Sequence, residues 1–164
     1  MTVASRATTP ALLQIDAVLS RLRGRAALRE VSRFLRESFS HYRWVGVYRI
    51  DGTDLVLEGW DGPAATEHVR IPVAQGICGQ AVREARTVLV ADVRSAPEYL
   101  ACFRETRSEV VVPIRAGDRV VGEIDIDGNE IGAFDRSDGA FLETVAAKLS
   151  AAVEEVGAEP MPLA

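Results

Sequence analysis

The stretch SEVVVPIRAGDRVVGEIDID, which runs from Ser108 to Asp127, gives the clearest indication of the fold class of this 164-residue chain. It contains two runs rich in β-branched residues, 109–115 and 119–127, and the turn-forming sequence Ala116-Gly117-Asp118 lies between them. Two such runs around a short glycine-containing connection are typical of a β-hairpin. The stretch therefore predicts an antiparallel pair of strands as the centre of the fold.

Four carboxylic acids lie within this hairpin, and they are Glu109, Glu123, Asp125 and Asp127. Because side chains alternate between the two faces of a strand, Val121, Glu123, Asp125 and Asp127 share one face, and the two aspartates lie about 6–7 Å apart. Counting back from the turn places Glu109 opposite residues of the acidic end. Such a group can bind a ligand ammonium or supply a general acid. The alternatives are a solvated strand face and, for Glu109, a surface ion pair with a nearby arginine, Arg107 or Arg119.

Two aromatic residues lie four positions apart in a second predicted strand. Trp44 and Tyr48 therefore share one face of the run from Trp44 to Ile50. Aromatic residues in this position are typical of a hydrophobic core, and next to an acidic group they also form a cage for a methyl or cationic group.

The chain has two cysteines and two histidines, which are Cys78, Cys102, His41 and His68. Their spacing matches no compact zinc motif, so we expect no bound metal. Cys78 follows Gly76 at a predicted helix start, where the helix dipole favours a thiolate. A lone cysteine is usually a small buried hydrophobe, but a pair also supports redox chemistry in which one thiolate attacks and the other resolves a sulfenic acid.

The remaining patterns predict one α+β domain at 9–156, with flexible termini at 1–8 and 157–164. Thr8 and Thr9 before Pro10 indicate a helix start, with Pro10 near the first helical position, and Asp135 is the expected N-cap of the last helix. The predicted helices are 10–24, 28–39, 76–85 and 137–156, and the predicted strands are 44–50, 54–60, 68–72, 87–93, 109–115 and 119–127.

Composition excludes several classes of protein. The chain is 48% hydrophobic and 26% charged, with a net charge of −5, which does not fit a disordered protein. An acidic chain with scattered arginines does not fit a nucleic-acid-binding protein. No apolar run reaches the length of a membrane span, and no signal peptide precedes the first helix, so we expect a cytoplasmic protein.

Taken together, these motifs resemble the GAF-domain family, and more narrowly its free methionine-(R)-sulfoxide reductase branch. The resemblance extends over residues 30–150. It rests on the following segments: Trp44-Val-Gly-Val-Tyr48, Val69-Arg-Ile-Pro72, Gly76-Ile-Cys-Gly79, Ala101-Cys102, Ser108-Glu-Val-Val-Val-Pro113 and Gly122-Glu-Ile-Asp-Ile-Asp127.

The resemblance implies a central antiparallel sheet of about six strands flanked by helices, with the N- and C-terminal helices packed together. It implies that Cys102 attacks the sulfoxide sulfur and becomes a sulfenic acid. Glu109, Asp125 and Asp127 would bind the substrate ammonium and help to protonate the sulfoxide oxygen, and Trp44 and Tyr48 would line the methyl-sulfoxide pocket. No cofactor is expected, and thioredoxin or another thiol would serve as the reductant.

The chain departs from the family pattern at two positions. His68 replaces the usual resolving cysteine, so recycling would use Cys78 or an external thiol, and Glu123 replaces an aliphatic residue. The alternative function is a non-catalytic GAF module that senses a small ligand or, through Cys78 and Cys102, the redox state. A homodimer through the terminal helices is a further expectation.

Overall fold

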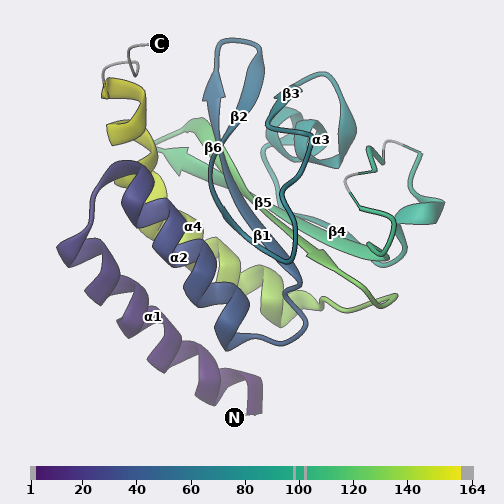
Figure 1. Ribbon diagram of the computed structural model, residues 1–164, viewed down its shortest axis with the longest axis horizontal. Helices are drawn as coiled ribbons and strands as arrows, with labels where there is room; N and C mark the ends of the chain where they lie inside the picture. The colour runs from purple at the N-terminus through teal and green to yellow at the C-terminus, as the bar shows by residue number, and fades with distance from the viewer. Residues whose placement is uncertain (1–2, 98, 102, 160–164) are drawn as a thin grey trace.

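A computed structural model describes residues 3–97, 99–101 and 103–159, so Cys102 lies outside the described residues. Six strands form one antiparallel sheet in the order β3-β2-β1-β6-β5-β4 (Figure 1). The strands are β1 (Trp44–Asp51), β2 (Asp54–Asp61), β3 (Arg70–Pro72), β4 (Val88–Val90), β5 (Ser108–Ala116) and β6 (Arg119–Gly128). The helices are α1 (Val3–Arg21), α2 (Gly24–Ser38), α3 (Gly76–Glu84) and α4 (Arg136–Ala158), with a 3-10 turn at Val93–Ser95.

Helices α1, α2 and α4 lie together on one face of the sheet, and α1 contacts α4 (Figure 1). The main core fills the space between these helices and the sheet. Val45 and Val47 of β1 and Ile124 and Ile126 of β6 face this core, as the predicted alternation requires. The expected packing of the terminal helices and the α+β class are therefore confirmed.

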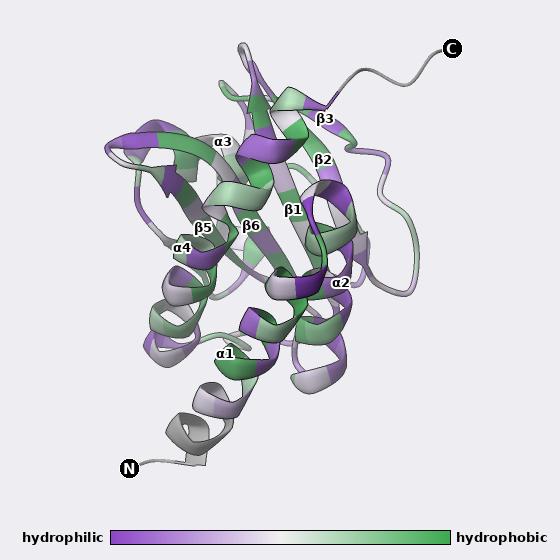
Figure 2. Cartoon of the chain, turned by 90° about the vertical axis from the view of Figure 1, so that its left-hand side faces the viewer, coloured by the Kyte–Doolittle hydropathy of each residue, from purple (hydrophilic) through white to green (hydrophobic). Residues whose placement is uncertain are grey.

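A second, smaller core lies on the opposite face, beneath α3. It contains Trp44, Tyr48, Ile71, Ile77 and Cys78 with several neighbouring apolar side chains. Figure 2 shows hydrophilic segments between the hydrophobic ones in the central strands, because the residues that face α3 include carboxylic acids. This face of the sheet positions the candidate site.

The turns of both hairpins and the N-cap of the last helix lie where the sequence predicts them. Gly52 adopts a positive φ of 63° in the turn between β1 and β2, which glycine permits without strain. The Asp135 carboxylate accepts hydrogen bonds from the backbone N–H groups of Ser137 and Asp138, and Asp138 completes a capping box.

Two local predictions are wrong. Helix α1 begins at Val3, so Pro10 lies inside the helix; the apolar periodicity used for the prediction begins only at Leu12 and carries no signal for the first turns. The alternation in β6 also breaks at Val121. The ladder to β5 shifts beside Ile114, and Val121 packs into the main core instead of sharing a face with the acids.

Several predicted boundaries also differ: α1 ends at Arg21 and not at 24, α2 begins at Gly24 and not at 28, and β3 begins at Arg70 and not at 68. The strand predicted at 87–93 is limited to Val88–Val90, because the chain turns into the 3-10 segment. Helix α4 continues through Gly157 to Ala158. Among the described residues, no helix combines the length and the apolar character that a membrane crossing requires.

Candidate active site

The acidic group, which we define as Glu109, Glu123, Asp125 and Asp127, is buried. Glu123 is 0% exposed, Asp125 1%, Asp127 3% and Glu109 5%. The three residues of β6 alternate with apolar residues that face the main core, so they all point to the side of α3. The alternative of a solvated strand face is therefore wrong.

Glu109 joins this group from the neighbouring strand. It pairs with Asp127 in the β5–β6 ladder, as counting from the turn predicted. The two arginines considered as its surface partners pair elsewhere: Arg107 with Asp92 at 3.3 Å and Arg119 with Glu154 at 3.1 Å. Its burial places Glu109 inside the site and not at the surface.

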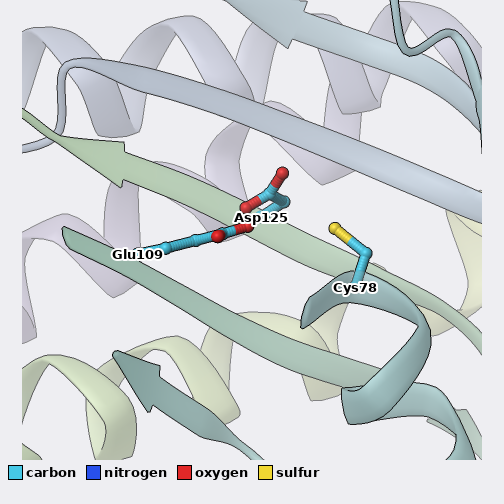
Figure 3. A group of neighbouring side chains, drawn as sticks. All are labelled: Cys78, Glu109 and Asp125. Atoms are coloured by element: carbon cyan, nitrogen blue, oxygen red, sulfur yellow. The ribbon is translucent and has the colours of Figure 1, made fainter. Parts of the chain in front are cut away.

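Helix α3 carries Cys78 over the acidic group. The Cys78 Sγ atom and one carboxylate oxygen from each of Glu109 and Asp125 all lie within 4.8 Å of one another. Figure 3 shows the three side chains converging from α3, β5 and β6. Gly76 starts the helix with a positive φ of 72°, and a side chain on Gly79 would overlap the Val73 carbonyl, so both glycines allow α3 to pack this closely.

Burial controls the protonation of the site. It raises the pKa of Glu123, Asp125 and Asp127 above the ordinary carboxyl range, because the charged form is poorly solvated. The nearby Asp125 raises the pKa of Glu123 and of Asp127 further, while contact with the Cys78 thiol lowers the pKa of Glu123. The net direction for these acids is upward, so the site is suited to hold protons.

The predicted thiolate at Cys78 is wrong. Burial raises the pKa of its thiol well above the ordinary value, and the carboxyl groups of Asp125, Glu123 and Glu109 raise it further. These effects outweigh the position of Cys78 near the start of α3, so Cys78 rests as a thiol.

Trp44 forms an aromatic wall beside Asp127. It stacks on Trp60 with a centroid separation of 6.2 Å and packs at a tilt against Phe103 at 5.9 Å. Side chains on Gly46 or Gly62 would overlap the Trp44 ring, so these glycines let the indole lie close to the backbone. Sequence reasoning identified Trp44 but missed Trp60 and Phe103, which reach it from β2 and from the segment before β5.

Tyr48 is buried at the other end of the site. Its hydroxyl donates a hydrogen bond of 2.9 Å to the backbone carbonyl of His68. The His68 backbone N–H in turn donates to the Thr66 hydroxyl at 3.0 Å. Tyr48 thus positions the backbone that leads into β3, and both predicted aromatic residues lie on the acidic face.

Several buried polar atoms in this region have no hydrogen-bond partner among the described residues. They are Trp44 Nε1, Asp125 Oδ1, Asp127 Oδ2 and both carboxyl oxygens of Glu123. Buried polar groups are normally paired, so such a concentration indicates that a polar ligand completes the site. A small zwitterion with an ammonium group would satisfy the acceptors.

The space beside Cys78 is small. A cavity of about 10 Å³ is lined by Ile71, Gly76, Ile77, Cys78, Leu100 and Glu109. A larger hollow of about 480 Å³ lies between β5 and α4 and touches none of the acidic group. We place the site at the small cavity because Cys78 and Glu109 of the acidic site line it, although it has to widen for an amino acid to enter.

The structure brings together six of the seven predicted site residues, and the seventh, Cys102, lies outside the described residues. Glu123 was noted in the sequence only as added charge. Its contact with Cys78 was missed, because no local pattern reports which residue of α3 covers β6.

The chain has relatives with known structures and names. A family model described as GAF domain matches residues 24–154. The free methionine-R-sulfoxide reductase of Escherichia coli (strain K12) is 33% identical over 124 residues, which cover 76% of this chain and 74% of that protein.

Two solved structures extend the comparison to three dimensions. A type II free methionine-R-sulfoxide reductase from Thermoplasma acidophilum is 39% identical, with a TM-score of 0.78 over 80% of this chain and 93% of its own. The free methionine-R-sulfoxide reductase from Neisseria meningitidis, solved in complex with its substrate, is 34% identical, with a TM-score of 0.85 over 96% and 94% of the two chains.

Proposed function

The chain belongs to the GAF domain family, in the branch of the free methionine-R-sulfoxide reductases, and from this premise we propose that it reduces free L-methionine (R)-sulfoxide to methionine. The observation that carries the proposal is the buried acidic group beside the aromatic wall. Both the acidic group and Trp44 of the wall have polar atoms without a hydrogen-bond partner among the described residues. A buried site of this kind fits a small free amino acid better than a residue in a peptide.

Each group has a role in the proposed binding mode. Glu109, Asp125 and Asp127 accept hydrogen bonds from the substrate ammonium, and Trp44 and Tyr48 border the methyl-sulfoxide end. Since burial raises the pKa of Asp125 and Asp127, a neutral carboxyl is available to protonate the sulfoxide oxygen as the S–O bond breaks.

The proposed nucleophile is Cys102. Its thiolate attacks the sulfoxide sulfur, the oxygen is transferred to the cysteine, and methionine leaves with its sulfur reduced by two electrons. Cys102 is thereby oxidised to a sulfenic acid. A second thiol then condenses with the sulfenic acid to give a disulfide and water, and a dithiol reductant such as thioredoxin returns both sulfurs to thiols.

The site favours an external thiol in the resolving step. His68 cannot form a disulfide, and the raised pKa of the Cys78 thiol makes it a slow attacking group at neutral pH. We therefore propose that an external thiol resolves the Cys102 sulfenic acid at least as fast as Cys78 does.

The test compares the purified wild-type chain with Cys102→Ser and Cys78→Ser. With free methionine (R)-sulfoxide and dithiothreitol, we expect methionine release by the wild type and by Cys78→Ser but none by Cys102→Ser. The (S) epimer and a peptide-bound sulfoxide serve as substrate controls. If no variant releases methionine while calorimetry still detects binding of the sulfoxide, the chain is a sensor of small ligands and the enzymatic proposal is wrong.

A further inference from the structure

Three side chains in the site have the composition of a metal-binding set. Cys78 supplies a sulfur, and Glu109 and Asp125 supply carboxylate oxygens, with all three ligand atoms within 4.8 Å of one another (Figure 3). They come from α3, β5 and β6, which are separate elements fixed by the sheet and the second core. Ligand atoms in a tetrahedral zinc site are separated by about 3.5 Å, so only a small contraction of this set is required.

Unpaired oxygen atoms point to a cation independently of this spacing. Asp125 is 1% exposed, and its Oδ1 atom has no hydrogen-bond partner among the described residues. Glu123, which contacts the Cys78 thiol, is fully buried, and neither of its carboxyl oxygens is paired within the described part of the chain. In that same part, no arginine or lysine forms an ion pair with Asp125 or Glu123.

The cavity beside Cys78 and Glu109 has the dimensions of an ion. It measures about 10 Å³ and is lined by Cys78 and Glu109 together with apolar side chains. This volume corresponds to roughly one water molecule or one desolvated metal ion. An ion can therefore occupy the cavity without the widening that an amino acid requires.

We propose that Cys78, Glu109 and Asp125 form a binding site for a divalent cation of the zinc class. The thiol selects against Mg²⁺ and Ca²⁺, which prefer all-oxygen sites, and favours Zn²⁺ or Cd²⁺. Binding converts the thiol to a thiolate, and the two carboxyl groups bind as carboxylates, so the thiol proton is released to solvent. Glu123, when protonated, can donate its O–H to the thiolate sulfur and support the ligand from outside.

If the chain has the proposed reductase function, the metal site also predicts competition between the cation and the substrate. Glu109 and Asp125 would also bind the substrate ammonium, so the cation and the amino acid exclude each other. The cation then acts as a reversible inhibitor that competes with methionine sulfoxide.

The experiment uses Cys102→Ser, in which Cys78 is the only cysteine of the chain. Titration with Cd²⁺ is followed by the near-ultraviolet thiolate-to-metal charge-transfer band and by calorimetry. We expect one ion per chain, a band that disappears in Cys78→Ser/Cys102→Ser, and an affinity at least tenfold weaker when Glu109→Gln or Asp125→Asn is added. Asp118→Asn removes an exposed acid from the β5–β6 turn and leaves the affinity unchanged. Circular dichroism verifies that each variant is folded.

The outcomes separate the metal site from the proposed function. A missing band, a band that persists without Cys78, or an affinity insensitive to Glu109→Gln and Asp125→Asn overturns the metal site. Since the tested variant lacks the nucleophile, its metal binding does not depend on turnover. If Cd²⁺ binds as expected but methionine sulfoxide does not displace it, the metal site stands and the assignment of the ammonium site is wrong.

Discussion

Trp44 faces Asp127 across the ladder between β1 and β6, and each residue keeps one buried polar atom without a hydrogen-bond partner among the described residues. These atoms are the indole Nε1, which is a donor, and the carboxyl Oδ2. A donor and an acceptor left unpaired at one register position indicate a ligand with polar groups of both kinds. The proposed substrate, which has an ammonium, a carboxylate and a sulfoxide oxygen, provides them.

The first prediction concerns this carboxyl. Asp127→Asn replaces one carboxyl oxygen with an NH2 donor that cannot accept from the ammonium, and a hydrogen bond to a charged group contributes about 1.5–3 kcal/mol, so kcat/KM should fall by about 10- to 100-fold. Steady-state measurement of methionine release tests this. The exposed-acid variant Asp118→Asn, which also loses one negative charge, should keep the wild-type value; an equal loss in both variants would assign the effect to overall charge.

The second prediction concerns the position of the Trp44 ring. Gly46→Ala places a methyl group where the indole lies, and overpacking of this kind destabilises a core by about 1–3 kcal/mol. We expect a higher KM and a changed fluorescence spectrum, since Trp44 and Trp60 are the only tryptophans of the chain. Gly139→Ala is the control, because a Cβ there makes an ordinary contact of 3.7 Å with Thr87. Unchanged fluorescence and KM in Gly46→Ala would contradict the prediction.

The third prediction follows from Glu123, whose pKa is raised mainly by burial. Below the ordinary carboxyl pKa, the folded and unfolded chains both hold this proton. As the pH rises, the unfolded chain releases it first, so the folded state loses stability until the pH passes the raised pKa. Glu123→Leu removes this loss and should be about 1–3 kcal/mol more stable than the wild type at pH 8, with a smaller difference at pH 4.

Thermal melting at both pH values checks the sign of this effect. Asp125 and Asp127 also have a raised pKa, so the variant should keep part of the pH dependence of the wild type. A variant that is less stable than the wild type at pH 8 would show that the Glu123 carboxyl has a stabilising partner.

The fourth prediction concerns the start of α4. Hydrogen bonds from the Ser137 hydroxyl and from the Asp138 backbone lower the pKa of Asp135. The stabilisation that the Asp135 carboxylate provides is therefore complete above the ordinary carboxyl pKa. It is lost as the pH falls through the lowered pKa of the folded chain. Asp135→Ala should lower stability by about 1 kcal/mol at pH 7 and show little difference from the wild type near pH 2. Denaturant titration at the two pH values measures this, and Asp135→Asn, which keeps a capping oxygen, should retain most of the stability.

The fifth prediction concerns recycling. By the family resemblance, His68 occupies the position of a resolving cysteine, so His68→Cys should increase turnover with thioredoxin and leave turnover with dithiothreitol unchanged. Glu67→Cys introduces a thiol at the exposed neighbouring position and should not increase turnover. The Tyr48 hydroxyl bonds to the backbone of residue 68, so the substitution spares that contact. An equal increase in turnover with thioredoxin in both variants would contradict the prediction, because any additional thiol near the site would then have the same effect.

Most of the elements and the two faces of the central strands could be predicted from the amino-acid sequence, with Val121 as the exception in β6. Strand alternation in β6 separated Ile124 and Ile126 from Asp125 and Asp127, and the turn length placed Glu109 beside Asp127. The carboxylate of Asp135 identified the start of α4. These features depend on periodicity and on hydrogen bonds between near neighbours, and the amino-acid order records both directly.

The chemical state of the site could not be predicted in this way, because it depends on the packing of α3 against the sheet. The same acids would be ordinary surface carboxylates without α3 above them, and Cys78 would lie at an ordinary helix start. Packing across the sheet removes water from these groups, which reverses the expected ionisation of Cys78 and brings its sulfur to Glu109 and Asp125. Desolvation depends on contacts between residues far apart in the chain, and for this reason no local pattern contained it.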